Sequence, residues 1–495
     1  MTIRCYGEGW RVMGRRTGRW RGRTVLAGAA ALFSVVASVG QATAAGTPPP
    51  YRFAADAERV EGTTTATDAV RLTPGTTYRS SIRNKGKLYY GLRLDAVSTA
   101  YVSATAVPKA GTKVVYADGI KVSIQDPNGH KCFSGDAAEA RFGPTETPRP
   151  LTAWASRRTG PGTYSCKGAG TYSVLVERIS GAESSPDDWE LELRYVSEPA
   201  LKKAASTTAP EVWNSASPQV IDGPARPRKG GTSFNEARAL EQGVWKDLVQ
   251  AGQTLFYRVP VDWGQQFYAT AELGPASGDG FLGNALGLSL YNPVRALVDD
   301  AGAGYDGTQK SATLEPLPPV AYENRYDIDD QVSGMRFAGW YYLAVHLGEE
   351  MADKFGDGPL DLTLRVRVSG VAGAPVAYDG AVVPRDVFDV TAGDKDAASI
   401  GAVAPGGDGD GDAGPDGNTA MKAVAAGGIG AGTVLVLGLG VWTVVARRRA
   451  AAAAGAAAPA AGSPGAGSPG AGAVAVPFAD RPDARSREYG PPRTW

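Results

Sequence analysis

Histidine and cysteine are scarce in this chain of 495 residues, which holds only two His and three Cys. A Ser-His-Asp triad needs a His beside its Ser and Asp, and the chain has no G-x-S-x-G sequence. His130 and His346 lie in different halves of the chain, and two such histidines do not make a metal site. We therefore predict no catalytic, cofactor-binding or metal-ligating set. Both histidines are expected at the surface, His130 in a turn and His346 on the outward face of a strand.

Paired carboxylates are the remaining catalytic option, because a glycosidase works without His. The candidates are 327–330 and Glu349-Glu350, and both groups are expected in solvated loops. The acidic run 408–412 alternates Asp and Gly like a calcium loop, but it lacks the Gly at position six and the Glu at position twelve. A hydrolase of unfamiliar type is therefore kept only as a third hypothesis, and loose calcium binding at 408–412 stays open.

The net charge of zero hides an uneven distribution of charge. Residues 1–23 carry seven Arg and one acid, and the chain from Arg447 onward carries seven Arg and three acids. The remainder, 24–446, holds 37 basic and 47 acidic residues, a net charge of −10. A nucleic-acid binder must neutralise phosphates, so this acidic middle excludes nucleic acid as a partner.

The N-terminus has the pattern of an export signal. Clustered Arg residues precede the apolar stretch Val25–Val39, and Ala42-Thr43-Ala44 follows as a cleavage site. We predict a signal peptide over 1–44 that uses the general secretion route. Either Met1 or Met13 is compatible with the start.

A second apolar stretch, 423–446, has 24 residues without a charge. A helix of that length reaches about 36 Å, enough to cross a bilayer of about 30 Å. Arg447 to Arg449 follow directly, and positive residues stay inside. The prediction is a single-pass protein of the cell membrane, with its N-terminal region extracellular and a disordered cytoplasmic tail over 447–495.

Composition divides the exported part into five segments. These are a Pro-rich lead (45–59), a first domain (60–198), a linker (199–218), a second domain (219–370) and a flexible Gly/Asp stalk (371–422). Four segments of the first domain align, in order, with four of the second at an offset between 166 and 171. The matched pairs are Leu88–Asp95 with Leu255–Asp262, Ile120–Pro127 with Leu286–Pro293, Gly170–Val176 with Gly339–Val345, and Leu191–Arg194 with Leu362–Arg365. Such a constant offset indicates a duplicated domain.

The repeated segments are predicted to be strands, because apolar and polar residues alternate with period two. Asp126-Pro127-Asn128-Gly129 has the composition of a turn. The expected fold is all-β, with two tandem jelly-roll-like antiparallel β-sandwiches plus one C-terminal transmembrane helix. Cys5 is lost with the signal peptide, which leaves Cys132 and Cys166 as an even pair outside the membrane. We predict a disulfide between them.

The order of features within each copy resembles a known family. A small residue and a Leu before a Gly are followed by an aromatic strand, a D-P or N-P turn and a Gly-aromatic-Tyr strand. The first three positions are Ala69, Leu72 and Gly75 in one copy and Ala237, Leu240 and Gly243 in the other. This order is similar to the bacterial pre-peptidase C-terminal (PPC) domain, a jelly-roll-like sandwich appended to secreted enzymes. The resemblance covers roughly 60–198 and 219–370. Lys87 and Thr254 stand where the family has an acidic residue, so no ligand role is carried over. The whole architecture also resembles secreted, membrane-anchored proteins of high-GC bacteria.

Aromatic residues of the second domain supply one binding hypothesis. Trp is favoured at interface hot spots and in carbohydrate stacking. An aromatic binding face would consist of Trp245, Trp263, Trp340 and Tyr342, although most of these are expected in the core. The leading hypothesis is a non-enzymatic, membrane-anchored extracellular protein-interaction or adaptor protein of the bacterial cell envelope, whose partner is another envelope or membrane protein. The alternative is a module that binds cell-wall polysaccharide.

Overall fold

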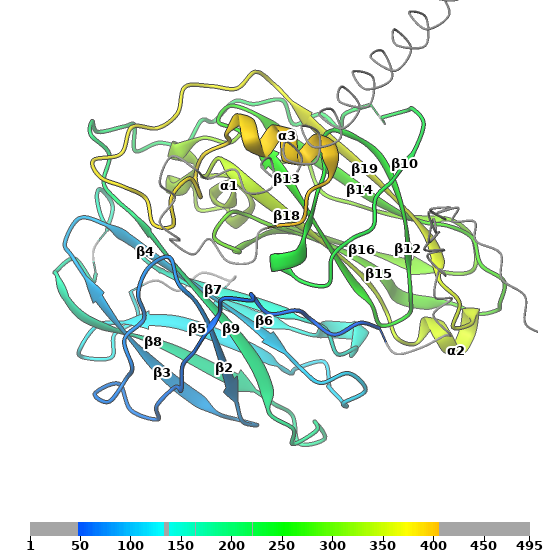
Figure 1. Ribbon diagram of the computed structural model, residues 1–495, viewed down its shortest axis with the longest axis horizontal. Coiled ribbons are helices and arrows are strands. Elements are labelled where there is room, and N and C mark those ends of the chain that lie inside the picture. Colours follow the sequence, from blue (N-terminus) through cyan, green and yellow to red (C-terminus); the bar gives the residue numbers. More distant parts are fainter. Residues whose placement is uncertain (1–47, 133–137, 164, 220, 405–495) are drawn as a thin grey trace, which may run out of the picture. The chain divides into compact units, whose positions relative to one another are not determined.

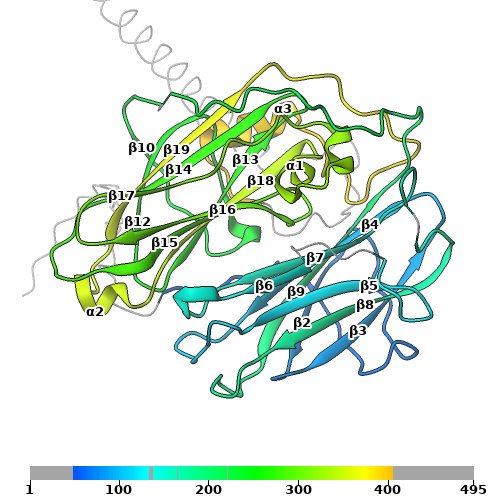
Figure 2. The same ribbon diagram turned by 180° about the vertical axis from the view of Figure 1, so that it is seen from behind.

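The computed structural model describes residues 48–132, 138–163, 165–219 and 221–404, which form two β-sandwiches (Figure 1). The predicted signal peptide, transmembrane helix and cytoplasmic tail lie outside these residues. Within them, no helix combines the length and apolar character that a bilayer crossing requires. Figure 2, seen from behind, shows that the blue-to-cyan strands of the first half of the chain and the green-to-yellow strands of the second half build separate sandwiches.

Sandwich 1 (residues 58–198) consists of a sheet ordered β1-β2-β9-β4-β7 and a sheet ordered β3-β8-β5-β6. Its strands are β1 Glu58–Arg59, β2 Thr77–Ile82, β3 Lys87–Leu94, β4 Thr99–Val107, β5 Gly119–Gln125, β6 Glu139–Arg141, β7 Leu151–Arg157, β8 Gly170–Ile179 and β9 Trp189–Glu198. A 3₁₀ turn, η2 (Gly143–Thr145), precedes β7. The facing sides of the two sheets enclose a single apolar core, in which Val102, Val174 and Leu191 are fully buried.

Sandwich 2 (residues 226–369) consists of a sheet ordered β10-β12-β19-β14-β17 and a sheet ordered β11-β13-β18-β15-β16. Its strands are β10 Arg226–Pro227, β11 Arg238–Ala239, β12 Gly243–Val249, β13 Thr254–Val261, β14 Gln266–Leu273, β15 Leu282–Tyr291, β16 Leu297–Tyr305, β17 Lys310–Thr313, β18 Gly339–Leu347 and β19 Leu360–Ser369. Short helices lie between them: η3 Phe234–Glu236, η4 Tyr322–Tyr326, α1 Asp330–Gly334 and α2 Met351–Phe355.

The duplication predicted from the sequence is confirmed by the strand order. The sheet β1-β2-β9-β4-β7 corresponds strand for strand to β10-β12-β19-β14-β17, and β3-β8-β5-β6 corresponds to β13-β18-β15-β16. The register agrees as well, because Leu88 pairs with Val176 just as Leu255 pairs with Val345. The expectation of purely antiparallel sheets needs one correction, since β1, β10 and β11 each pair with their neighbour in parallel.

Period-two alternation explains the strands. In β19, Leu362, Leu364 and Val366 face the core with at most 1% exposure, whereas Arg365 points to the other side and pairs with Glu272 at 2.7 Å. Burial of alternate apolar side chains supplies the main stabilisation of such a sheet. The predicted disulfide between Cys132 and Cys166 is present, with the Cα atoms 5.4 Å apart.

Residues 371–404, the part of the predicted stalk that the structure describes, contain a helix and contact both sandwiches; we call them the C-terminal strap. Its helix α3 (Ala392–Ile400) begins with a capping box in which Thr391 and Asp394 satisfy each other's backbone N–H groups. Val383 bridges to Ser197 of sandwich 1, and Val403 bridges to Arg238 of sandwich 2. The Gly content of the stalk suggested mobility, whereas the strap buries apolar side chains such as Phe388 and Ala398.

Candidate functional site

Two sheets, one from each sandwich, pack their outer faces together. On β9 of sandwich 1 the outward positions Glu192, Val196 and Glu198 are at most 1% exposed. On β18 of sandwich 2 the outward positions Tyr342 and Ala344 are also buried. Aromatic rings join the two sides, as Tyr101 of β4 meets Phe337 edge-on at 5.3 Å between centroids. The strands β4, β9 and β18 are therefore buried on both faces. We call the interface between the two sandwiches, where these outward faces meet, the junction.

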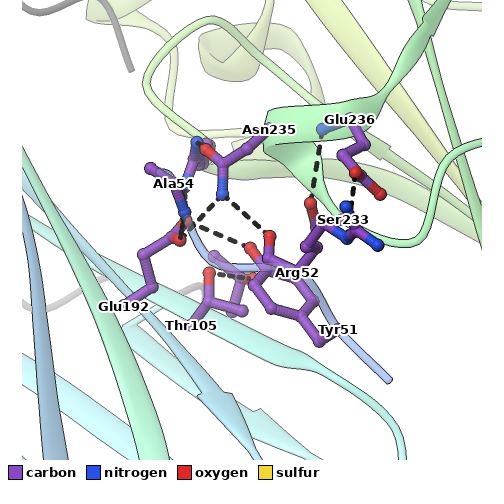
Figure 3. Close-up of polar contacts among 10 residues, drawn as sticks. Tyr51, Arg52, Ala54, Thr105, Glu192, Ser233, Asn235 and Glu236 are labelled. Carbon is purple, nitrogen blue, oxygen red and sulfur yellow. Dashed lines mark hydrogen bonds and ion pairs between the residues drawn. The ribbon is translucent and has the colours of Figure 1, made fainter. Parts of the chain in front are cut away.

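Glu192 is the centre of a buried polar cluster in the junction (Figure 3). Its carboxylate accepts a charge-assisted hydrogen bond from Arg295 of sandwich 2 and another from Asn235 at 2.7 Å. The Tyr51 hydroxyl and the Ala54 backbone N–H of the N-terminal lead also donate to it, each at 3.1 Å. One carboxylate thus joins three segments of the chain. A buried ion pair needs such additional hydrogen bonds to offset the cost of desolvation.

The electrostatics of this cluster keep each donor protonated. Burial raises the pKa of the Tyr51 hydroxyl well above its usual value, and the neighbouring Glu192 carboxylate adds to the effect. Burial is the largest effect on the pKa of Arg295 and lowers it, but the Glu192 charge and hydrogen bond together with Tyr51 and Tyr342 outweigh burial, and the pKa rises. Both groups consequently remain donors to the carboxylate throughout the physiological pH range.

The turn between β15 and β16 places Arg295 in the junction. Asn292 Oδ1 accepts the backbone N–H groups of Val294 and Ala296, each at 3.1 Å, and Arg295 adopts a left-handed φ of 60°. The duplicate turn in sandwich 1 has the same design around Asp126, with Gly129 at the left-handed position. Few residues other than glycine adopt such a φ, because it strains the backbone. The contacts of Arg295 in the junction offset this strain.

Glu198 forms a second buried cluster in the junction. Arg325 of η4 donates to both of its carboxylate oxygens, at 2.8 and 3.0 Å. The hydroxyls of Tyr101 and of Tyr378 in the C-terminal strap donate at 2.7 and 3.0 Å. Burial alone would raise the pKa of Glu198, but the Arg325 charge and the hydrogen bonds from Arg325, Tyr101 and Tyr378 outweigh burial and lower the pKa. The carboxylate is ionised and its hydrogen-bonding capacity is taken up.

A pocket of about 520 Å³ opens beside the Glu198 cluster, between the two sandwiches. Its polar lining comes from β4, from the loop after β7, and from the η4–α1 segment. The lining residues are Thr99, Tyr101, Arg158, Thr159, Pro161, Gly162, Thr163, Arg325, Tyr326, Asp327, Ile328, Asp330, Ser333 and Arg336. Three of these are arginines. The pocket is the candidate functional site, because it combines concavity with converging charged groups.

The four aromatic residues of the predicted binding face do not share one surface. Trp245 and Trp263 lie in the core of sandwich 2, with 1% and 4% exposure. Tyr342 and the partly buried Trp340 lie on the outward face of β18, within the junction. The Trp340 indole donates to Asp394 of the C-terminal strap at 2.9 Å. Sandwich 2 thus uses two of these rings inside its core and two on the outward face of β18.

His346 is buried, which corrects the expectation that it lies at the surface, whereas His130 is exposed in its turn. The alternation did place His346 on the outward face of β18, but sandwich 1 covers that face. Its Nδ1 lies 3.0 Å from Thr254 Oγ1. Burial, together with the nearby Arg149 charge, lowers the pKa of His346 to about 3. The imidazole is therefore neutral in the folded protein.

A neutral buried His makes stability depend on pH. Below about pH 6.5 the unfolded chain binds a proton at His346 that the folded chain refuses until about pH 3. Stability is therefore full above pH 6.5 and falls through this window, by about 2 kcal/mol at pH 5. Urea unfolding of the purified protein at pH 7 and pH 5 measures this loss. His346→Gln is expected to reduce the difference in unfolding free energy between pH 7 and pH 5 by about 2 kcal/mol, whereas His130→Gln should leave that difference unchanged. The same pH-dependent loss of stability in both variants would refute the assignment to His346.

The acidic candidates are dispersed. Asp329 caps the N-terminus of α1 by accepting the backbone N–H of Gln331 at 2.8 Å, and Glu349 lies in the turn before α2. No group of three or more metal-binding side chains occurs in the part of the chain that the structure describes. The run 408–412 lies outside that part. Asp329 therefore has a structural role. The sequence patterns above did not single out Glu192, Arg295 or Arg336 as site residues.

Comparison with known proteins gives only weak similarity. No family model and no curated protein matches the chain. The tandem CBM22-1–CBM22-2 domain of Paenibacillus barcinonensis Xyn10C is 9% identical, covering 61% of this chain and 93% of that one, with a TM-score of 0.17. The CUB1-EGF-CUB2 domain of human MASP-1/3 is 7% identical, over 58% and 99%, with a TM-score of 0.15. The ANXUR2 extracellular domain from Arabidopsis thaliana is 8% identical, over 60% and 86%, with a TM-score of 0.16. No family follows from these values; the chain is a tandem β-sandwich protein.

Proposed function

We propose that the protein is a non-enzymatic, membrane-anchored extracellular adaptor of a bacterial cell envelope, which binds another envelope or membrane protein. Its export signal, single membrane segment and cytoplasmic tail are the predictions made above from residues 1–44, 423–446 and 447–495. The PPC-like, jelly-roll-like character of both sandwiches belongs to the same proposal and rests on the order of features in their sequence.

The fixed junction is the observation that carries this proposal. Two buried charged clusters, around Glu192 and Glu198, and the C-terminal strap all connect the two sandwiches. A platform that keeps its shape without a partner loses less entropy when it binds one. Ile328, fully exposed at the rim of the pocket, supplies an apolar contact of the kind that interfaces bury.

The alternative, a module that binds cell-wall polysaccharide, is less well supported. It relied on Trp side chains that stack on sugars at a surface, and Trp245 and Trp263 lie in the core.

Crosslinking on intact cells, followed by purification of the full chain, tests the proposal. The wild type is expected to capture the same envelope protein repeatedly, and Ile328→Asp to lower the yield about tenfold. Val212→Asp is the matched control, because Val212 is 92% exposed in the linker and outside the pocket. Repeated absence of a specific partner, or equal yields from both variants, would contradict the proposal. Protease added to the same cells should digest the sandwiches.

A further inference from the structure

The pocket in the junction is lined by more guanidinium groups than buried carboxylates. Arg158, Arg325 and Arg336 all contribute to its lining. The buried carboxylate of this region, Glu198, is already engaged by Arg325 through two hydrogen bonds. Both of its oxygens also accept a tyrosine hydroxyl, so it has no further capacity for Arg336. Glu198 therefore offers no acceptor to Arg336, the third arginine of the pocket.

Arg336 is the least exposed of the three, with 2% of its surface accessible. Its Nε and Nη1 find no hydrogen-bond acceptor among the residues that the structure describes, and its Nη2 reaches Ser333 Oγ only at 3.5 Å. Burial, followed by the neighbouring Arg158 charge, lowers the pKa of Arg336 to about 9. The guanidinium is thus charged at neutral pH. It lies 5.4 Å from the Trp154 ring and 5.7 Å from the Phe337 ring, but no carboxylate hydrogen-bonds to it in the described residues, and a buried cation without a hydrogen-bonded counter-ion is costly.

The acidic side chains of the pocket lie toward solvent. Asp330 is exposed at the start of α1, and Asp327, which is partly exposed, accepts the backbone N–H of Asp329. Their charges are screened by water, whereas the charge of Arg336 is not. Thr99, Thr159 and Thr163 line the same pocket, where the Thr159 hydroxyl donates to the Val97 carbonyl at 2.7 Å and lies 3.2 Å from the Thr99 hydroxyl. Guanidinium groups therefore border a polar space large enough for a small ligand group.

We propose that this pocket binds an oxyanion, a phosphate or carboxylate group of a ligand, between Arg336 and Arg158. An arginine binds such groups through charge-assisted hydrogen bonds, and its planar fork matches their geometry. The bound anion supplies the negative charge that Arg336 lacks. This inference goes beyond the proposed function, because it concerns the purified chain alone and stands even where no partner protein is found.

Calorimetric titration of the purified full-length protein tests the inference. Inorganic phosphate and acetate are the two probes, with the ionic strength held constant by potassium chloride. The wild type is expected to bind at least one of them at a single saturable site. Binding of phosphate alone would assign a phosphate-bearing ligand, and binding of acetate a carboxylate-bearing one. Failure of both probes to bind would overturn the proposal.

Variants separate an anion site from a structural arginine. Arg336→Met removes the charge at similar length and is expected to weaken binding about tenfold or more. Because it also removes an uncompensated buried cation, its thermal midpoint without anion should equal or exceed that of the wild type. Arg158→Gln, at the half-buried side of the pocket, should weaken binding similarly. It tests the site independently if the Arg336 variant fails to fold. Arg93→Gln, exposed on β3, is the control. Unchanged affinity in both pocket variants would refute the assignment.

Discussion

Glu192→Gln is expected to destabilise the folded protein by about 3–5 kcal/mol. The substitution keeps the size of the side chain but leaves the Arg295 guanidinium charged, buried at 4% side-chain exposure and without its counter-ion. It also weakens the acceptor for Tyr51 and Asn235. Denaturant unfolding of the purified protein measures the change. The loss of unfolding free energy should exceed that caused by breaking a surface ion pair, because water cannot solvate the buried charge that is left behind.

The ion pair of Lys113 and Glu183 provides the matched control. It joins two exposed side chains of sandwich 1 at 2.7 Å, outside the junction. Glu183→Gln is therefore expected to leave the unfolding free energy unchanged within error. A double substitution of Glu192 and Arg295 by apolar residues of similar volume should recover much of the stability that the single variant loses. A Glu192→Gln variant as stable as the wild type would contradict the structural role of this cluster.

Removal of the disulfide is expected to cost about 3–4 kcal/mol of stability in the chain-entropy account. Cys132 and Cys166 are 34 positions apart, so the bond closes a long loop and restricts the unfolded chain. The double variant Cys132→Ser/Cys166→Ser tests the effect in denaturant unfolding. Both half-cystines also pack against the core of sandwich 1, so some of the loss comes from the folded state.

Reduction of the wild-type protein gives an independent measure of the same bond. The reduced wild type and the double variant should unfold at similar denaturant concentrations, both below that of the oxidised wild type. Sandwich 2 has no equivalent bond, so the fold itself does not depend on it. Equal stability of the oxidised and reduced wild type would show that the bond contributes nothing.

The register of the duplicated strands could be predicted from the sequence, because it depends on local periodicity. Leu88 and Leu255 occupy equivalent pairs with β8 and β18, as the gapless alignment requires. The D-P and N-P turns also follow from local chemistry, since Asp126 and Asn292 accept backbone N–H groups in the same manner. Alternation predicts which side of a strand faces the core of its own sandwich.

Alternation does not predict what covers the other side. The outward residues of β9, Glu192 and Glu198, have the composition of a solvated face, yet the other sandwich buries them. The same reason explains the wrong expectation for His346. Arg295 replaces the glycine of the duplicate turn, and this difference between the copies was the one available signal for the junction. Contacts between distant segments are set by tertiary packing and leave little trace in a local pattern.

Calorimetric unfolding of the wild-type protein tests most directly whether the two sandwiches behave as one body. The clusters around Glu192 and Glu198 and the C-terminal strap predict that both sandwiches melt in a single cooperative transition, with equal calorimetric and van't Hoff enthalpies. Two separate transitions, one for each sandwich, would contradict the fixed junction on which the proposed platform and its anion pocket depend.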